Sequence, residues 1–188
     1  MGAFKPLLPF GQKTVIESCV DYLSQSQEII VVLGHRADEI REQLRNVTIA
    51  INPEPDSEMG ASIAVGIQAL PETAKAVLIA LVDHPAVPAA IVSTLIQEWQ
   101  NGARIVIPTW QNRGGHPVLV DLSFKNELVD LDQTGGLRSL FQTHREDVKR
   151  LPVYSPFVAR DMDTWDDYVA LHEEAFGYPP PNPKNDQR

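Results

Sequence analysis

Short, continuous apolar runs alternate with helix-like segments along most of the chain. The clearest run is KAVLIALV at 75–82, which is apolar and rich in β-branched residues and lies between polar turns. Further strand-like runs occupy 28–33, 47–51, 103–108, 116–121 and 149–154. Helical spacing of apolar residues occurs at 14–25, 37–45, 59–70, 88–100, 136–144 and 164–175. This alternation predicts an α/β fold with a mainly parallel sheet and helices on both faces.

The chain shows neither a second domain boundary nor an internal repeat. Its 188 residues, 43% of them hydrophobic, suit one globular domain, which we place at 1–176. The remaining segment at 177–188, GYPPPNPKNDQR, is proline-rich and polar, and is predicted to be a disordered or extended tail.

The charge, the cysteine content and the lack of targeting patterns each exclude or disfavour a feature of the protein. A formal net charge of -9 argues against nonspecific binding of nucleic acid, which requires Lys and Arg. The single cysteine, Cys19, excludes an internal disulfide and fits a small buried apolar residue better than a nucleophile. Since neither a signal-peptide pattern nor a membrane-spanning run is visible, we expect a cytoplasmic protein without a membrane partner.

Ligands of open α/β sheets bind beyond the carboxyl ends of the strands, so the residues that follow strands are the first candidates for a site. Asp83 ends the most apolar strand, where an unpaired carboxylate is costly to bury. A role in metal binding is favoured over a helix cap, because the next helix begins near Pro88. Asp161 and Asp163 lie on a later extended segment and are expected to face opposite ways. Carboxylates from two strand ends could hold Mg²⁺ against nucleotide phosphates.

Other candidates have both a functional and a structural interpretation. The two glycines of RGGHP at 113–117, Gly114 and Gly115, permit close approach of a ligand, or they form an ordinary strand-entry turn. Helix N-termini such as the one at Met59-Gly60-Ala61-Ser62 bind anions, but a plain cap explains the segment equally well. Four further residues with the same ambiguity are Lys5 (a phosphate ligand or a solvated terminal lysine), Arg138 (a cation beside a glycine loop or a surface residue), and His84 and His116 (bases or structural histidines).

Taken in order, these segments resemble a known family. MGAFKPLLPFG, VLGH, NPEPDSEMGASIAVG, LVDHP, RGGHPVLV, GGLR and DMDTWDDY, within 1–173, follow the order seen in the MobA-like nucleotidyltransferases. They look most like the molybdenum cofactor cytidylyltransferase branch and its xanthine dehydrogenase accessory relatives. The resemblance implies a Rossmann-like fold of the nucleotide-diphospho-sugar transferase type. It also implies transfer of CMP or GMP from CTP or GTP to molybdopterin, with Mg²⁺ and release of pyrophosphate.

The resemblance also implies residue roles. Asp83 matches the metal-binding and catalytic aspartate, and Asp163 matches the second acidic position. Lys5 matches the lysine of the nucleotide loop, counted here as catalytic and nucleotide-binding. Gly60 and Ser62 match the segment near the base and ribose, while Gly114, Gly115 and His116 match the segment facing the pterin.

The chain departs from the family pattern at its start. Family members begin with an apolar strand and a loop resembling LAAGxSxRMG, whereas this chain begins at the Met of that loop, so the first strand is expected to be absent. Thr134 stands where an aspartate is expected. A start site assigned too late, a fragment and a degenerate relative are the three explanations, and we favour the first. If the chain as given is the whole molecule, weak nucleotidyl transfer or none is expected.

Two other functions stay open at this stage. One is nucleotidyl transfer to a different phosphorylated small molecule, such as a sugar phosphate. The other is a non-catalytic module that binds or chaperones the molybdenum cofactor, with a molybdoenzyme as partner. The two aspartates favour an enzyme, since a pure binding module has little use for a pair of metal ligands.

Overall fold

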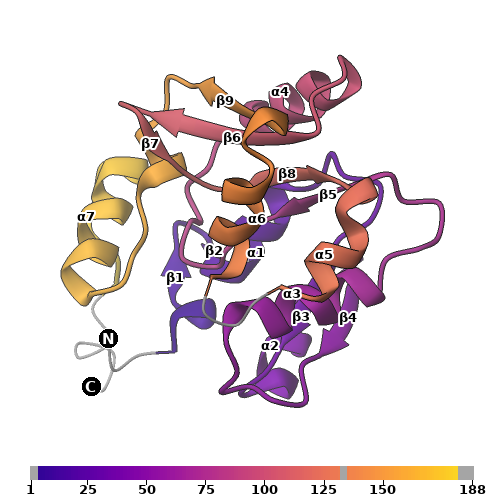
Figure 1. Ribbon diagram of the computed structural model, residues 1–188. Helices are drawn as coiled ribbons and strands as arrows, with labels where there is room; N and C mark the ends of the chain where they lie inside the picture. The colour runs from indigo at the N-terminus through magenta and orange to yellow at the C-terminus, as the bar shows by residue number, and fades with distance from the viewer. Residues whose placement is uncertain (1–3, 132–134, 182–188) are drawn as a thin grey trace.

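A five-stranded mixed sheet lies at the centre of the computed structural model, which describes residues 4–131 and 135–181 (Figure 1). β8 lies between β5 and β6 and is antiparallel to both. β7 continues the hairpin on the β8 side of β6, and β9 pairs in parallel along the opposite edge of β6. The strands are β5 (Ala76–Ile79), β6 (Ile105–Trp110), β7 (Arg113–Gly114), β8 (Val118–Asp121) and β9 (Val148–Pro152).

Two smaller sheets precede the central one in sequence. β1 (Pro9–Phe10) and β2 (Lys13–Thr14) form a hairpin, and β3 (Ile30–Leu33) pairs in parallel with β4 (Thr48–Ile51). The α-helices are α1 (Val15–Tyr22), α2 (Ala37–Gln43), α3 (Met59–Gln68), α4 (Ala89–Gln100), α5 (Lys125–Val129), α6 (Gly136–Thr143) and α7 (Trp165–Phe176). Short 3-10 turns are η1 (Lys5–Leu7), η2 (Leu122–Phe124), η3 (Arg145–Asp147) and η4 (Pro156–Ala159). Over the described residues, every helix is too short or too polar to cross a bilayer.

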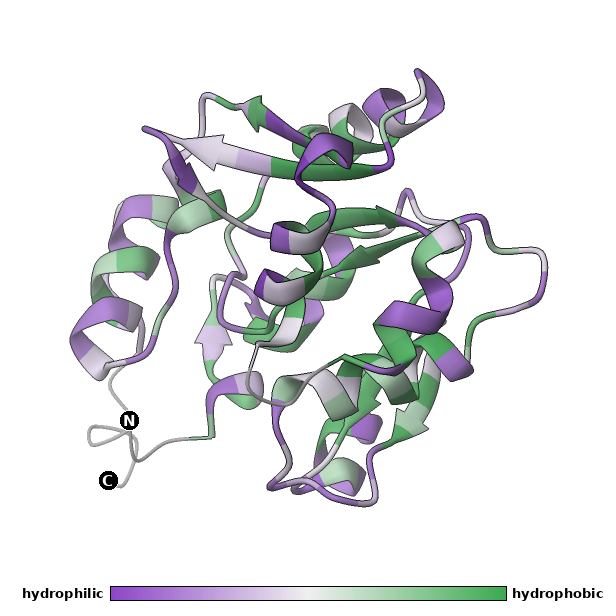
Figure 2. Cartoon of the chain, in the orientation of Figure 1, coloured by the Kyte–Doolittle hydropathy of each residue, from purple (hydrophilic) through white to green (hydrophobic). Residues whose placement is uncertain are grey.

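Helices cover both faces of the central sheet, as the sequence predicts. Successive side chains of a strand point to opposite faces, so Val106 packs with α1 and α4, whereas Ile105 and Ile107 pack with α3, α5 and α6. Leu119 and Val120 of β8 divide in the same way. Figure 2 shows the apolar residues concentrated on β5, β6 and β8. The α/β class is therefore confirmed.

The expectation of a mainly parallel sheet is wrong in one respect. β3 and β4 are parallel, as are β6 and β9, but β8 is antiparallel to both of its neighbours. The physical reason is the connection from β6 to β8, residues 111–117, which contains β7 and no helix. A parallel return requires a crossover of a dozen or more residues, so a connection this short reverses the chain.

The β3–β4 pair is separate from the five-stranded sheet. Within the described residues β3 pairs only with β4, and β5 pairs only with β8, so each strand has one edge without a partner strand. Apolar contacts bridge the interruption, because Val82 beyond β5 belongs to the same cluster as Val31 and Leu33 of β3.

The first hairpin packs against the last helix. The Tyr168 hydroxyl donates to the carbonyl of Pro9 at 2.5 Å, and the Gly11 amide donates to Nε2 of His172 at 3.1 Å. The ring of Phe10 lies edge-on to those of His172 and Phe176. These contacts bring the two ends of the described chain together in space (Figure 1). His172 also donates from Nδ1 to the carbonyl of Tyr178, while most of the predicted tail, 182–188, lies outside the described residues.

Candidate functional site

Asp83 lies just beyond β5 and does not serve as a helix cap. The N-cap of α4 is Pro88, and no hydrogen bond from the Asp83 carboxylate reaches that helix. Its Oδ1 atom is buried without a hydrogen-bond partner in the described part of the chain, while 26% of the side chain is exposed. A carboxylate in this state is costly unless a cation or water compensates it. The geometry therefore fits a metal-binding carboxylate.

Lys5 and Asp163, far apart in sequence, lie in contact. Nζ of Lys5 is 2.7 Å from Oδ1 of Asp163, with 26% and 69% of the two side chains exposed. Asp163 is not needed to cap α7, because Thr164 and Asp167 form a complete capping box there. The Asp163 carboxylate thus neutralises the charge of the Lys5 ammonium.

Asp161 does not point away from Asp163 as expected. Met162 between them is fully buried, and both aspartates are exposed. Residues two apart on an extended segment share a face, so the expectation was wrong on geometric grounds.

Apolar packing holds the acidic segments near one another. Val82, next to Asp83, shares one cluster with Met162, next to Asp163, and another with Leu7 of η1. Over the described residues, however, no three His, Cys, Asp or Glu side chains are grouped as metal ligands. A metal ion held by two carboxylates would complete its coordination with phosphate oxygens and water, which is the usual arrangement for Mg²⁺.

Ser62 and Gly60 lie at the start of α3, beside a loop that Asn52 organises. The buried Asn52 amide donates to the hydroxyls of Ser62 and Ser57, and its carbonyl oxygen accepts from the Glu54 amide. Sequence analysis did not single out Asn52, although the Asn-Pro pair after β4 is a turn signal. Because the Ser62 hydroxyl accepts this hydrogen bond, its own proton can still be donated to another group. A Cβ on Gly60 would meet only ordinary contacts, the nearest 3.4 Å away, so sterics do not require glycine there.

The segment Gly114-Gly115-His116 passes close to η4. A Cβ on Gly115 would lie 2.0 Å from the carbonyl oxygen of Val158, which no side chain can tolerate. The His116 amide donates to the same oxygen at 2.8 Å. Gly114 has ordinary space around it. Glycine at 115 is thus explained by packing, whereas Gly114 is not constrained in this way.

Two histidines connect Asp83 with this segment. His84 Nε2 is 3.7 Å from Oδ1 of Asp83, and the His84 and His116 rings are 5.4 Å apart. Nδ1 of His116 lies 3.3 Å from the carbonyl oxygen of Ile79, which makes Nδ1 the donor. Burial lowers the pKa of His116, against the opposing effect of that carbonyl, so the neutral ring is favoured. Burial also raises the pKa of the Cys19 thiol to about 12, as suits a structural cysteine.

A cavity of about 890 Å³ opens beside Gly114, Gly115 and His116. We call it the arginine pocket, because Arg138, Arg145 and Arg150 are among its lining residues. Sequence analysis named Arg138 alone. Arg145 and Arg150 belong to no local motif, and only the packing of η3 and β9 brings them to the pocket.

Comparison with known proteins places this fold and site in a class. Residues 1–148 match the family model of the MobA-like NTP transferase domain. The homologue of Mycobacterium tuberculosis Rv0371c from Mycobacterium sp. strain JC1 is 28% identical, with a TM-score of 0.81 over 93% of this chain and 89% of that one. A search of curated proteins gave no match.

Two further solved structures are similar over nearly the same span. A nucleotidyl transferase from Methanothermobacter is 25% identical, with a TM-score of 0.79 over 92% of this chain and 85% of that one. Rv0371c from M. tuberculosis, solved as a complex with manganese, is 26% identical, with a TM-score of 0.78 over 92% and 93% of the two chains.

The family match therefore defines a protein of the nucleotidyltransferase class, and the solved structures share its Rossmann-like α/β fold. More specifically, the chain belongs to the MobA-like NTP transferase family, whose members use a nucleoside triphosphate and a divalent metal ion.

Proposed function

We propose that this protein transfers a nucleoside monophosphate from CTP or GTP to the phosphate of a molybdopterin-type acceptor, releasing pyrophosphate in a Mg²⁺-dependent reaction. The observation that carries the proposal is the Asp83 carboxylate beyond β5, which in the described part of the chain has a buried oxygen without a hydrogen-bond partner. Family membership supports the reaction class. The acceptor rests on the likeness to the molybdenum cofactor branch, and another phosphorylated small molecule is the alternative.

The proposed roles follow from charge and position. Asp83 and Asp163 would hold the metal ion, which when bound neutralises charge developing on the leaving pyrophosphate. Lys5 would exchange its contact with Asp163 for a phosphate oxygen. Gly60 and Ser62 would lie near the base and ribose. The acceptor phosphate is itself the nucleophile, so the protein acts by positioning and charge stabilisation without a nucleophilic side chain of its own.

Calorimetric titration with CTP and with GTP, each with and without Mg²⁺, tests the proposal. We expect Mg²⁺-dependent binding of one nucleotide, weakened at least about tenfold in Asp83→Asn, because a charged ligand to the metal is lost. Asp38→Asn, an exposed carboxylate on α2, is the matched control and should bind like the unsubstituted chain. Absence of nucleotide binding in a folded sample would overturn the proposal, as would equal affinity in Asp83→Asn.

A further inference from the structure

The arginine pocket is strongly cationic in a protein with a formal net charge of -9. Its three arginines come from separate elements: Arg138 from α6, Arg145 from η3 and Arg150 from β9. Among the described residues that line the pocket there is no carboxylate. Like charges on one cavity repel each other, so an anionic ligand would stabilise this arrangement.

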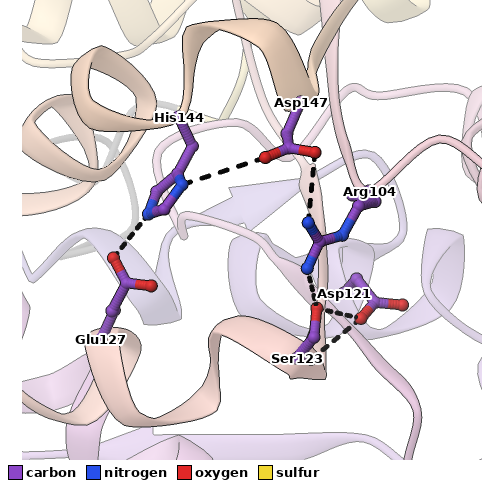
Figure 3. Close-up of polar contacts among 6 residues, drawn as sticks. All are labelled: Arg104, Asp121, Ser123, Glu127, His144 and Asp147. Atoms are coloured by element: carbon purple, nitrogen blue, oxygen red, sulfur yellow. Dashed lines mark hydrogen bonds and ion pairs between the residues drawn. The ribbon is translucent and has the colours of Figure 1, made fainter.

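The segment that carries Arg145 is held by polar contacts on both sides (Figure 3). Nε2 of His144 lies 2.6 Å from a carboxylate oxygen of Glu127 on α5. Asp147 accepts a hydrogen bond from Arg104 at 3.2 Å, and Arg104 also donates to Ser123. These contacts engage the carboxylates of Glu127 and Asp147 with other partners, while Arg145 between His144 and Asp147 lines the pocket.

The guanidinium of Arg150 lies next to Gly114. One of its guanidinium nitrogens, Nη1, lies 3.6 Å from the position that a Cβ on Gly114 would occupy. The nitrogen therefore lies beside the bare backbone of the segment Gly114-Gly115-His116. Arg138 is in the first turn of α6, and the N-cap residue of this helix, Gly135, makes no side-chain capping bond. The positive end of the helix dipole therefore adds to the positive electrostatic potential of the arginine pocket.

The remaining residues that line the arginine pocket indicate what kind of ligand would fit it. Met59, Leu137, Phe141 and Val118 contribute apolar surface to the pocket lining. Guanidinium groups bind oxyanions with paired hydrogen bonds, and an apolar wall suits a flat or hydrophobic body attached to the anion. The cavity volume of about 890 Å³ is within the range of small-molecule sites.

The pocket is joined to the catalytic end by His116, which lines the pocket and neighbours His84 beside Asp83. We infer that the arginine pocket is an anion subsite, in which Arg138, Arg145 and Arg150 bind an oxyanionic group of the acceptor other than the phosphate that attacks the nucleotide. This inference rests on the proposed function for the identity of the acceptor. It adds that the acceptor carries two anionic groups, one at each end of the site.

An amide NMR titration of the full 188-residue chain with inorganic phosphate, at constant ionic strength and without nucleotide, tests this subsite. Saturable shifts are expected at the amides of Gly114, Gly115 and Gly136. The double variant Arg145→Gln/Arg150→Gln should weaken the apparent affinity at least about tenfold, since paired guanidinium hydrogen bonds are lost. Arg36→Gln/Arg41→Gln, at the N-cap of α2 and within it, removes an equal charge elsewhere and should leave the affinity unchanged.

The anion subsite and the proposed function are tested by different experiments, so either can be overturned without the other. Shifts that do not saturate at these amides would overturn the subsite, as would equal affinity in the double variant with a dispersed spectrum. Each single variant provides the same test if the double variant does not fold. Nucleotide binding is measured in its own titration, so its absence would remove the proposed function while leaving the phosphate result as direct evidence on the pocket.

Discussion

The acidic end of the site and the arginine pocket are built in opposite ways. At the acidic end, Lys5 and Asp163 neutralise one another, and Asp83 keeps a buried oxygen without a partner. In the pocket, arginines line the cavity, and the nearby carboxylates of Glu127 and Asp147 are engaged with other side chains. On our two proposals this difference gives a polarised site, in which one end would bind a metal ion with phosphates and the other would bind an anion directly.

The largest effect is expected on stability, from Gly115→Ala. The added Cβ would lie 2.0 Å from the Val158 carbonyl oxygen, so the backbone of one segment must move. We expect the free energy of unfolding to fall by about 3 kcal/mol, the upper part of the usual range for overpacking. Urea denaturation measures this change.

Gly114→Ala is the matched control for that substitution. Its Cβ would meet Ile107 at 3.4 Å, an ordinary contact, so the loss should stay below about 1 kcal/mol. If the two variants are equally stable, Gly115 is not required for packing, and its glycine would need a ligand-based explanation.

A smaller effect is expected from Asp163→Asn, on binding more than on folding. Its pair with Lys5 is solvent-exposed, and such pairs stabilise a fold by only about 0–1 kcal/mol. Mg²⁺-dependent nucleotide affinity should nevertheless fall about tenfold, because a metal-binding charge is removed. Calorimetry with Asp166→Asn as the exposed control separates the two effects. A stability loss without an affinity loss would make Asp163 purely structural.

The smallest effect concerns the pH dependence of stability. Burial lowers the pKa of His116 in the folded chain, whereas the unfolded chain takes up a proton near its ordinary pKa of about 6.5. The resulting stability is present above that pH and is lost as pH falls through the folded pKa. Thermal unfolding at about pH 7.5 and about pH 5.5 should therefore show a smaller loss for His116→Gln than for the unsubstituted chain. Equal losses would mean that His116 does not titrate in this way.

The sequence named candidate residues at the acidic end and only some of those at the pocket, for a physical reason. Asp83 lies in the loop that follows β5, and strand ends in an α/β sheet lie where ligands bind. Gly114, Gly115 and His116, which line the pocket, were singled out by the RGGHP motif between β6 and β8. Lys5 and Asp163 were assigned through a resemblance, and their contact depends on the hairpin–α7 packing. Arg145 and Arg150 come from segments without a motif, and their convergence depends on how η3 and β9 pack.

The fold, too, was predictable from the sequence only in part. Apolar periodicity placed most helices and strands to within a few residues. It could do so because the spacing of apolar residues in a segment depends on which of its faces are buried. The direction of β8 was not predictable in this way. Its orientation is set by the connection between β6 and β8, since apolar runs look alike in parallel and antiparallel strands.

The most direct test of a metal–nucleotide centre at the acidic end is paramagnetic broadening by substoichiometric Mn²⁺ in the presence of the bound nucleotide. We predict selective loss of the amide signals of His84, Asp163 and Lys5, and no such loss in Asp83→Asn. Sharp signals at these three amides, with broadening only at carboxylates elsewhere on the surface, would contradict the assignment of Asp83 and Asp163 to the metal.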